Sequence, residues 1–148
     1  TMGAWGYNYF ENDAALDYMA DIETTDDPVD MVEDIFAEAL HGEYLDSDTG
    51  NAVVVAAAYV DRQMHGTSYS ASGSEEILDI DTFFERNPGV NFAPFRAKAV
   101  QALRKVIGEG SELLEEWTKN GTNAPHWRKS IEDLIARLDE GRAHLRIV

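Results

Sequence analysis

A run of small and branched apolar residues in the first half of the chain constrains the fold more than any other feature. Positions 52–60 contain no polar side chain apart from one tyrosine hydroxyl, and Asp61, Arg62 and Gln63 follow. A segment that is apolar on every side has to be buried on every side. Three consecutive valines at 53–55 suit a strand, but the four alanines and the length of the segment favour a helix. We therefore predict a central helix over 52–64, whose small side chains let neighbouring helices approach closely.

The segments on either side of this run have apolar residues at helical spacing, together with capping signals. Asn12 is a good N-cap for a helix that ends near Glu23, and Asp27-Pro28 opens a second helix that closes at Gly42. Further helices are predicted within 77–86, 92–108, 111–120 and 127–140, the last ended by a glycine. No internal repeat or hairpin signal occurs. We predict an all-α fold, a single-domain irregular bundle of six or seven helices over 1–148, with a docked N-terminal arm (1–11) and a flexible loop (65–75).

Charge is distributed very unevenly along the chain. The first fifty residues hold fourteen aspartates and glutamates but no lysine or arginine, and they account for most of the net charge of −16. Phosphate backbones are bound by clustered lysines and arginines, so this composition argues against nucleic-acid binding. The chain has no cysteine, no apolar run of about 18 residues and no signal-peptide pattern. We expect a cytoplasmic protein without disulfides that does not insert into membranes.

The opening residues carry a family resemblance. The pattern Met-Gly-Ala-Trp-Gly-x-x-x-Phe-Glu-Asn-Asp-x-Ala-x-Asp occupies residues 2–17 and resembles the start of a bacterial family known as domain of unknown function 4259. The likeness is looser further on, at the small-residue segment 52–59 and at a Ser-Glu-Leu-x-x-x-Trp pattern over 111–117. The resemblance implies a compact helical bacterial domain, and it brings no activity or catalytic residue with it.

The first two predicted helices each carry an acidic residue at every fourth position. We call these rows the acidic ladders, and their members are Asp13, Asp17, Asp21, Asp30, Asp34 and Glu38. Residues four apart lie one above another on a helix, so each ladder places like charges side by side at a cost of a few tenths of a kcal/mol per pair. A repulsive arrangement of this kind indicates that something basic faces it.

Four interpretations of the ladders remain open at this stage. The carboxylates are solvated, or they are neutralised by arginines within the chain, for which Arg62, Arg96, Arg104 and Arg128 are candidates. Alternatively they form a face that binds a partner, or they gather around Mg²⁺ or Mn²⁺, which prefer oxygen ligands. Trp5 is a further candidate for a binding face, because tryptophan is enriched among interface hot spots.

The usual catalytic and cofactor signatures are absent. The sequence has no His-Glu-x-x-His, no phosphate-binding Gly-rich loop with lysine and no Gly-x-Ser-x-Gly, and no two of its histidines have the spacing of a metal site. The stretch 46–51 resembles the start of a calcium-binding EF-hand loop, but Ala57 stands where a bidentate glutamate is needed. We expect Asp46 to be a helix N-cap instead, and we predict no catalytic residue, metal ligand or cofactor.

These observations favour a non-enzymatic domain whose acidic face docks a basic partner protein, with Trp5 and the six ladder acids as the contact residues. An immunity protein or antitoxin that covers the groove of a basic nuclease is the most concrete version. The alternatives are a divalent-metal-binding protein or metal-dependent hydrolase that uses the ladder carboxylates, and a homo-oligomer joined through the Trp5 region.

Overall fold

The computed structural model describes residues 9–10, 12–70, 77–121 and 123–147, and within these ranges all regular secondary structure is helical. Seven α-helices are present, accompanied by the 3₁₀ turns η1 (Asp79–Asp81) and η2 (Ala93–Phe95). The helices are α1 (Asp13–Thr24), α2 (Pro28–His41), α3 (Ser47–His65), α4 (Phe83–Arg86), α5 (Arg96–Val106), α6 (Glu112–Asn120) and α7 (Ala124–Ile147). The all-α prediction is confirmed.

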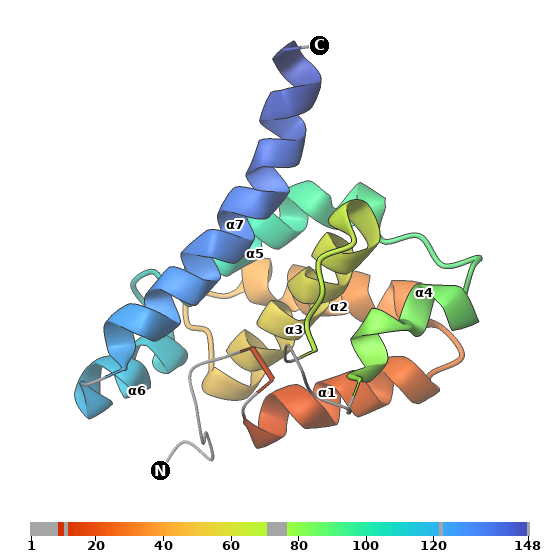
Figure 1. Ribbon diagram of the computed structural model, residues 1–148. Coiled ribbons are helices and arrows are strands. Elements are labelled where there is room, and N and C mark those ends of the chain that lie inside the picture. The colour runs from red at the N-terminus through yellow and green to blue at the C-terminus, as the bar shows by residue number, and fades with distance from the viewer. Residues whose placement is uncertain (1–8, 11, 71–76, 122, 148) are drawn as a thin grey trace.

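Helix α3 is the centre of the molecule, as its apolar sequence predicts. Every residue from Ala52 to Asp61 is buried, and α1, α2, α5, α6 and α7 all pack against α3 (Figure 1). The helix begins at Ser47, ahead of the apolar segment 52–64, because Asp46 is its N-cap as expected: Asp46 Oδ1 accepts a hydrogen bond from the Thr49 N–H at 2.8 Å. The aspartate that resembled a calcium ligand is thus the N-cap of the central helix.

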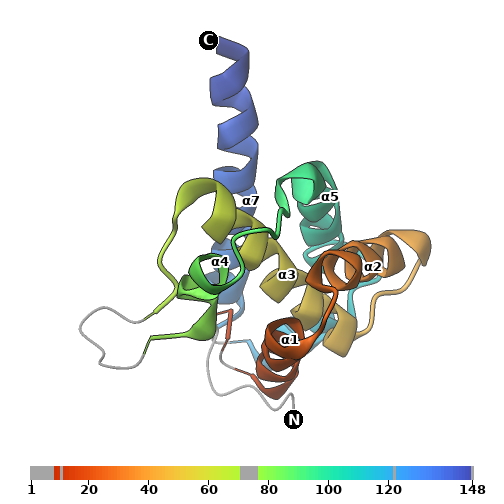
Figure 2. The same cartoon turned by 90° about the vertical axis from the view of Figure 1, so that its right-hand side faces the viewer.

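Helices α1 and α2 lie next to each other on the outside of α3 (Figure 2). Asn12 caps α1 by accepting from the Ala15 N–H at 2.7 Å, and its own amide donates to Asn51 of α3 at 3.3 Å. Asn12 is buried, so one side chain both starts α1 and fixes that start against the central helix. Asp27 caps α2, with Pro28 at the first helical position as predicted.

The structure corrects the sequence prediction at two places. The short helix expected from Ile77 divides into η1 and α4, and Ile77 itself is 62% exposed instead of belonging to the buried stripe. Helix α7 does not end at Gly141 but continues to Ile147 and extends away from the other helices (Figure 1). A glycine inside a helix costs only about 1 kcal/mol, which does not by itself end a long helix.

Two tryptophans join the last two helices. Trp117 of α6 and Trp127 of α7 are both buried, and their rings stack with centroids 5.9 Å apart and planes 11° from parallel. Parallel offset rings of this size bury a large apolar area and therefore hold α6 against α7. In the described part of the chain, no helix is both long and apolar enough to cross a membrane.

Candidate functional site

The acidic ladders lie on the surface of α1 and α2. The apolar faces of these helices, which include Met19 and Ile22 of α1 and Val32 and Phe36 of α2, point to the core. All six ladder acids are exposed on the other faces: Asp13, Asp17, Asp21, Asp30, Asp34 and Glu38. Amphipathic periodicity alone places them there, because each ladder falls between the apolar positions of its helix.

Tyr18 shows that the two ladders approach each other. Its ring lies between α1 and α2, and its hydroxyl donates to the Met31 carbonyl at 3.3 Å. Burial raises the pKa of Tyr18, and the charges of Asp21 on α1 and Asp34 on α2 raise it further. Carboxylates from both ladders therefore act on the same hydroxyl, and the ladders form one acidic surface, which we call the α1–α2 acidic face.

The acids of this face repel one another. The pKa of Asp30 is raised, chiefly by the hydrogen bond and the charge of Asp27, and also by the charges of Asp34 and Glu33. Raised carboxyl pKa values reflect like charges at short range, where ionisation of one group disfavours ionisation of the next.

None of the arginines considered as internal partners pairs with a ladder acid. Arg62 pairs with Asp81, Arg104 with Asp139 and Arg128 with Glu132. Among the described acids between residues 12 and 50, Glu23 alone forms an ion pair, with Arg86 at 2.8 Å. The described histidines, aspartates and glutamates also contain no group of three arranged to hold a metal ion. Trp5 lies outside the described residues, so its place relative to this face stays a prediction.

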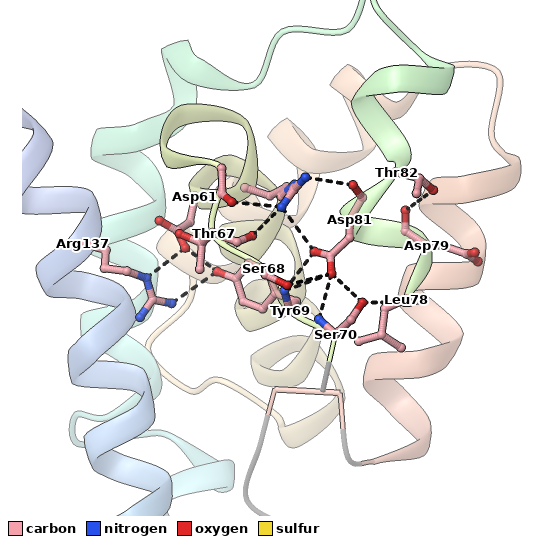
Figure 3. Close-up of polar contacts among 12 residues, drawn as sticks. Asp61, Thr67, Ser68, Tyr69, Ser70, Leu78, Asp79, Asp81, Thr82 and Arg137 are labelled. Carbon is pink, nitrogen blue, oxygen red and sulfur yellow. Dashed lines mark hydrogen bonds and ion pairs between the residues drawn. The ribbon is translucent and has the colours of Figure 1, made fainter. Parts of the chain in front are cut away.

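Sequence patterns did not reveal a second polar cluster on the other side of α3. Asp61 is completely buried, and its Oδ2 accepts from Arg137 Nε of α7 at 2.9 Å and from the Tyr69 hydroxyl at 2.5 Å (Figure 3). Burial raises the pKa of Tyr69, and the neighbouring Asp61 charge raises it further. The rings of Tyr9 and Phe10 meet Tyr69 edge-on, so this cluster joins the N-terminal segment, α3 and α7.

Next to this cluster, Asp81 of η1 holds the segment that follows α3 through a set of hydrogen bonds, which we call the Asp81 clasp. Its carboxylate accepts from the N–H groups of Tyr69 and Ser70 and from the Ser70 hydroxyl, and it faces Arg62 at 3.7 Å (Figure 3). Burial alone raises a carboxyl pKa, but the bonds from Ser70 and Tyr69 and the Arg62 charge outweigh it, so the pKa of Asp81 is lowered. The Ser70 hydroxyl oxygen also accepts a hydrogen bond from the Leu78 N–H at 2.9 Å. The described part of the predicted flexible loop, 65–70, is therefore held in place by Asp81, while 71–76 lie outside the described residues.

One unused signal in the sequence could have indicated the buried cluster. Asp61 directly follows nine buried residues of an otherwise apolar helix, at a position where an aspartate needs a partner. Its partner Arg137 is 76 residues away in the sequence, so only the packing of α7 against α3 reveals the pair.

The structure is thus a small helical domain. It has an exposed acidic face on α1 and α2 and an Asp61–Arg137 ion pair in its interior. The family model described as Domain of unknown function (DUF4259) matches residues 3–130, and the chain belongs to this family. No curated protein matches the chain, and no solved structure matches it either.

Proposed function

We propose that the protein is a non-enzymatic binding domain whose α1–α2 acidic face docks a basic partner protein. One observation carries the proposal. Six exposed carboxylates lie on two adjoining helices, and no described lysine or arginine forms an ion pair with any of them. A face whose acids have no ion-pair partner among the described residues keeps its field available for a ligand of opposite charge.

The energetics favour a partner over simple solvation as the reason for this arrangement. Like charges spaced four residues apart destabilise a helix. The pKa of Asp30 is raised chiefly by Asp27 at the helix N-cap, and the charge of the next ladder acid, Asp34, raises it further. Lysines and arginines of a docked protein remove the repulsion and add attraction. Complementary charge also raises the association rate and discriminates against acidic competitors.

The most specific form of the proposal is an immunity protein or antitoxin. A nuclease has to present a basic groove to bind its nucleic-acid substrate, and an acidic face of a small stable domain can cover that groove. The size of the domain, its net charge of −16 and the absence of catalytic motifs from its sequence support this form.

The test compares two variants that change the net charge equally. The face variant carries Asp13→Asn, Asp17→Asn and Asp21→Asn on α1, and the control variant carries Glu85→Gln, Glu109→Gln and Glu115→Gln at exposed positions outside α1 and α2. Each immobilised protein is used to capture proteins from lysate of the source organism at low salt. The retained protein is then purified, and its association rate is measured against ionic strength.

We expect the wild type and the control variant to retain the same basic protein, with an association rate that falls steeply as salt rises. The face variant should associate at least about tenfold more slowly, because electrostatic steering contributes one or more orders of magnitude to association rates. Equal rates for the two variants would place the contact elsewhere. Capture of no protein by the wild type would count against a docking function.

A further inference from the structure

The carboxylate oxygen Oδ1 of Asp61 is the basis of an inference that does not depend on the α1–α2 acidic face. Both hydrogen bonds to this side chain end on Oδ2, where Arg137 Nε and the Tyr69 hydroxyl donate. Oδ1 is equally buried and receives no hydrogen bond from any described residue. The cluster thus supplies hydrogen-bond donors to Oδ2 of this buried carboxylate and supplies none to Oδ1.

A buried oxygen in this situation needs an explanation. Most buried polar groups in proteins have a hydrogen-bond partner, because losing hydration without replacement is unfavourable, and more so for a charged group. Three partners are chemically available to Oδ1, namely a proton, a metal ion and a water molecule.

A proton and a metal ion both fit poorly. A proton on Oδ1 would turn this oxygen into a donor in need of an acceptor, and it would weaken the ion pair with Arg137. A divalent ion requires several oxygen ligands, but Asp61 belongs to no group of three acids or histidines in the described part of the chain. The guanidinium of Arg137, at 2.9 Å from Oδ2, already supplies the positive charge that balances this carboxylate.

We propose that Asp61 Oδ1 binds one buried water molecule at the junction of α3, α7 and the segment after α3. Water is neutral, so it satisfies the oxygen without disturbing the charge balance of the pair. It also needs further polar partners to stay bound. The Tyr69 hydroxyl donates to Asp61 and accepts from Arg137 at 3.3 Å, and its second lone pair can accept a hydrogen bond from the same water.

A crystal structure of the whole chain at about 1.5 Å resolution tests the proposal, since an ordered water bound by two or more groups gives a distinct density peak. We expect one peak within about 3.0 Å of Asp61 Oδ1, at the hydrogen-bond distance for O–H···O contacts. Empty density at that position overturns the proposal. So does a protein donor there, including one supplied by a residue outside the described ranges.

The matched control is the double variant Asp61→Leu with Arg137→Leu, which replaces the ion pair with apolar side chains of similar size. Its crystals should lack the peak, because an apolar site does not hold water. A peak that persists in the double variant belongs to the backbone and overturns the assignment to Oδ1. If the double variant does not fold, the density in the wild-type crystals decides alone.

Discussion

Gly110 occupies a backbone position that only glycine can fill. Its φ of 84° lies in the left-handed region, and an added Cβ would stand 2.5 Å from the Glu43 carbonyl oxygen. The close approach exists because Leu45 pairs with the chain on both sides of Ser111, donating to the Gly110 carbonyl and accepting from the Glu112 N–H. This single bridge fixes the start of α6 against the start of α3.

Replacing Gly110 with alanine should destabilise the protein by about 3 kcal/mol or more, from backbone strain and from displacement of the bridge. The control is Gly66→Ala, at a φ of 70° with no atom within 4 Å of the added Cβ, which carries the backbone cost of about 1 kcal/mol alone. Urea unfolding followed by the fluorescence of Trp117 and Trp127 measures both. Equal losses of stability in the two variants would mean that the Leu45–Ser111 bridge adjusts to the added Cβ without a cost in free energy.

Lys105 of α5 caps the C-terminus of α2. Its ammonium donates to the carbonyls of Ala39 at 2.6 Å and Gly42 at 2.5 Å, at the negative end of the helix dipole. Lys105→Met should therefore cost about 1–2 kcal/mol in free energy of unfolding. The exposed Lys98→Met on the same helix is the control and should change stability by less than about 0.5 kcal/mol. A small effect at Lys105 would show that solvent satisfies these carbonyls equally well.

At the scale of elements, the Asp61–Arg137 pair joins α3 to α7. Arg137→Leu leaves a buried carboxylate without its counter-charge, and we expect a loss of about 3–5 kcal/mol. Hydrogen exchange should accelerate along α7, because the helix loses its polar anchor on the core.

A second pair between α5 and α7 provides the comparison. Arg104 and Asp139 are 60% and 44% exposed, and Arg104→Leu should cost less than about 1 kcal/mol because solvent screens the pair. The double variant Asp61→Leu with Arg137→Leu should recover much of the loss caused by Arg137→Leu alone. An equally large loss for the double variant would show that the cluster acts through packing instead of charge.

The Asp81 clasp makes stability depend on pH. Because folding lowers the pKa of Asp81, its stabilisation is complete above the unfolded value of about 3.9 and is lost as the pH falls through the folded value. Asp81→Asn should be less stable than the wild type by about 1–2 kcal/mol at pH 7. The gap should shrink as the pH falls below the unfolded value and through the lowered folded value, where wild-type Asp81 becomes protonated.

Unfolding curves recorded at intervals from pH 7 to about pH 3 test this dependence, within the range where carboxylates titrate. The exposed Glu85→Gln is the control, and its difference from the wild type should stay small throughout. A constant gap for Asp81→Asn across the range would mean that the carboxylate charge contributes nothing to the clasp.

The whole molecule carries a net charge of −16, and its N-terminal third contains no lysine or arginine. Self-repulsion of this kind destabilises the compact state and is screened by salt. Asp17→Asn with Asp21→Asn should therefore raise stability at low salt, by a few tenths of a kcal/mol for each like-charge contact removed. The gain should shrink at 1 M NaCl, where the Debye length is about 3 Å.

The control for this prediction is Glu109→Gln with Glu115→Gln, which changes the net charge equally at exposed positions outside the ladders. This control variant should gain less stability than Asp17→Asn with Asp21→Asn, because Glu109 and Glu115 do not belong to a ladder. Thermal unfolding at two salt concentrations measures both variants. Equal gains would show that total charge matters and that the arrangement in ladders does not.

Much of the fold was predictable because its signals are local. The apolar run over 52–60 is buried on all sides wherever its helix is placed, and the caps at Asn12, Asp27 and Ser111 act on N–H groups within three residues. The exposure of the ladder acids follows from the same periodicity that buries the opposite faces. The misplaced end of α7 has a local cause as well, since a glycine lowers the stability of a helix without excluding its continuation.

The sequence by itself determined the helical class, the central helix and the acidic character of α1 and α2, because periodicity and charge act over a few residues. Only the tertiary structure decided which charges meet. It brings Arg137 to Asp61 across 76 positions and Arg86 to Glu23, and it lets the charges of Asp21 and Asp34 both act on Tyr18. The ladders remain without a described basic partner. These pairings depend on how helices pack against α3, and the free energy of packing is shared among residues far apart in the chain.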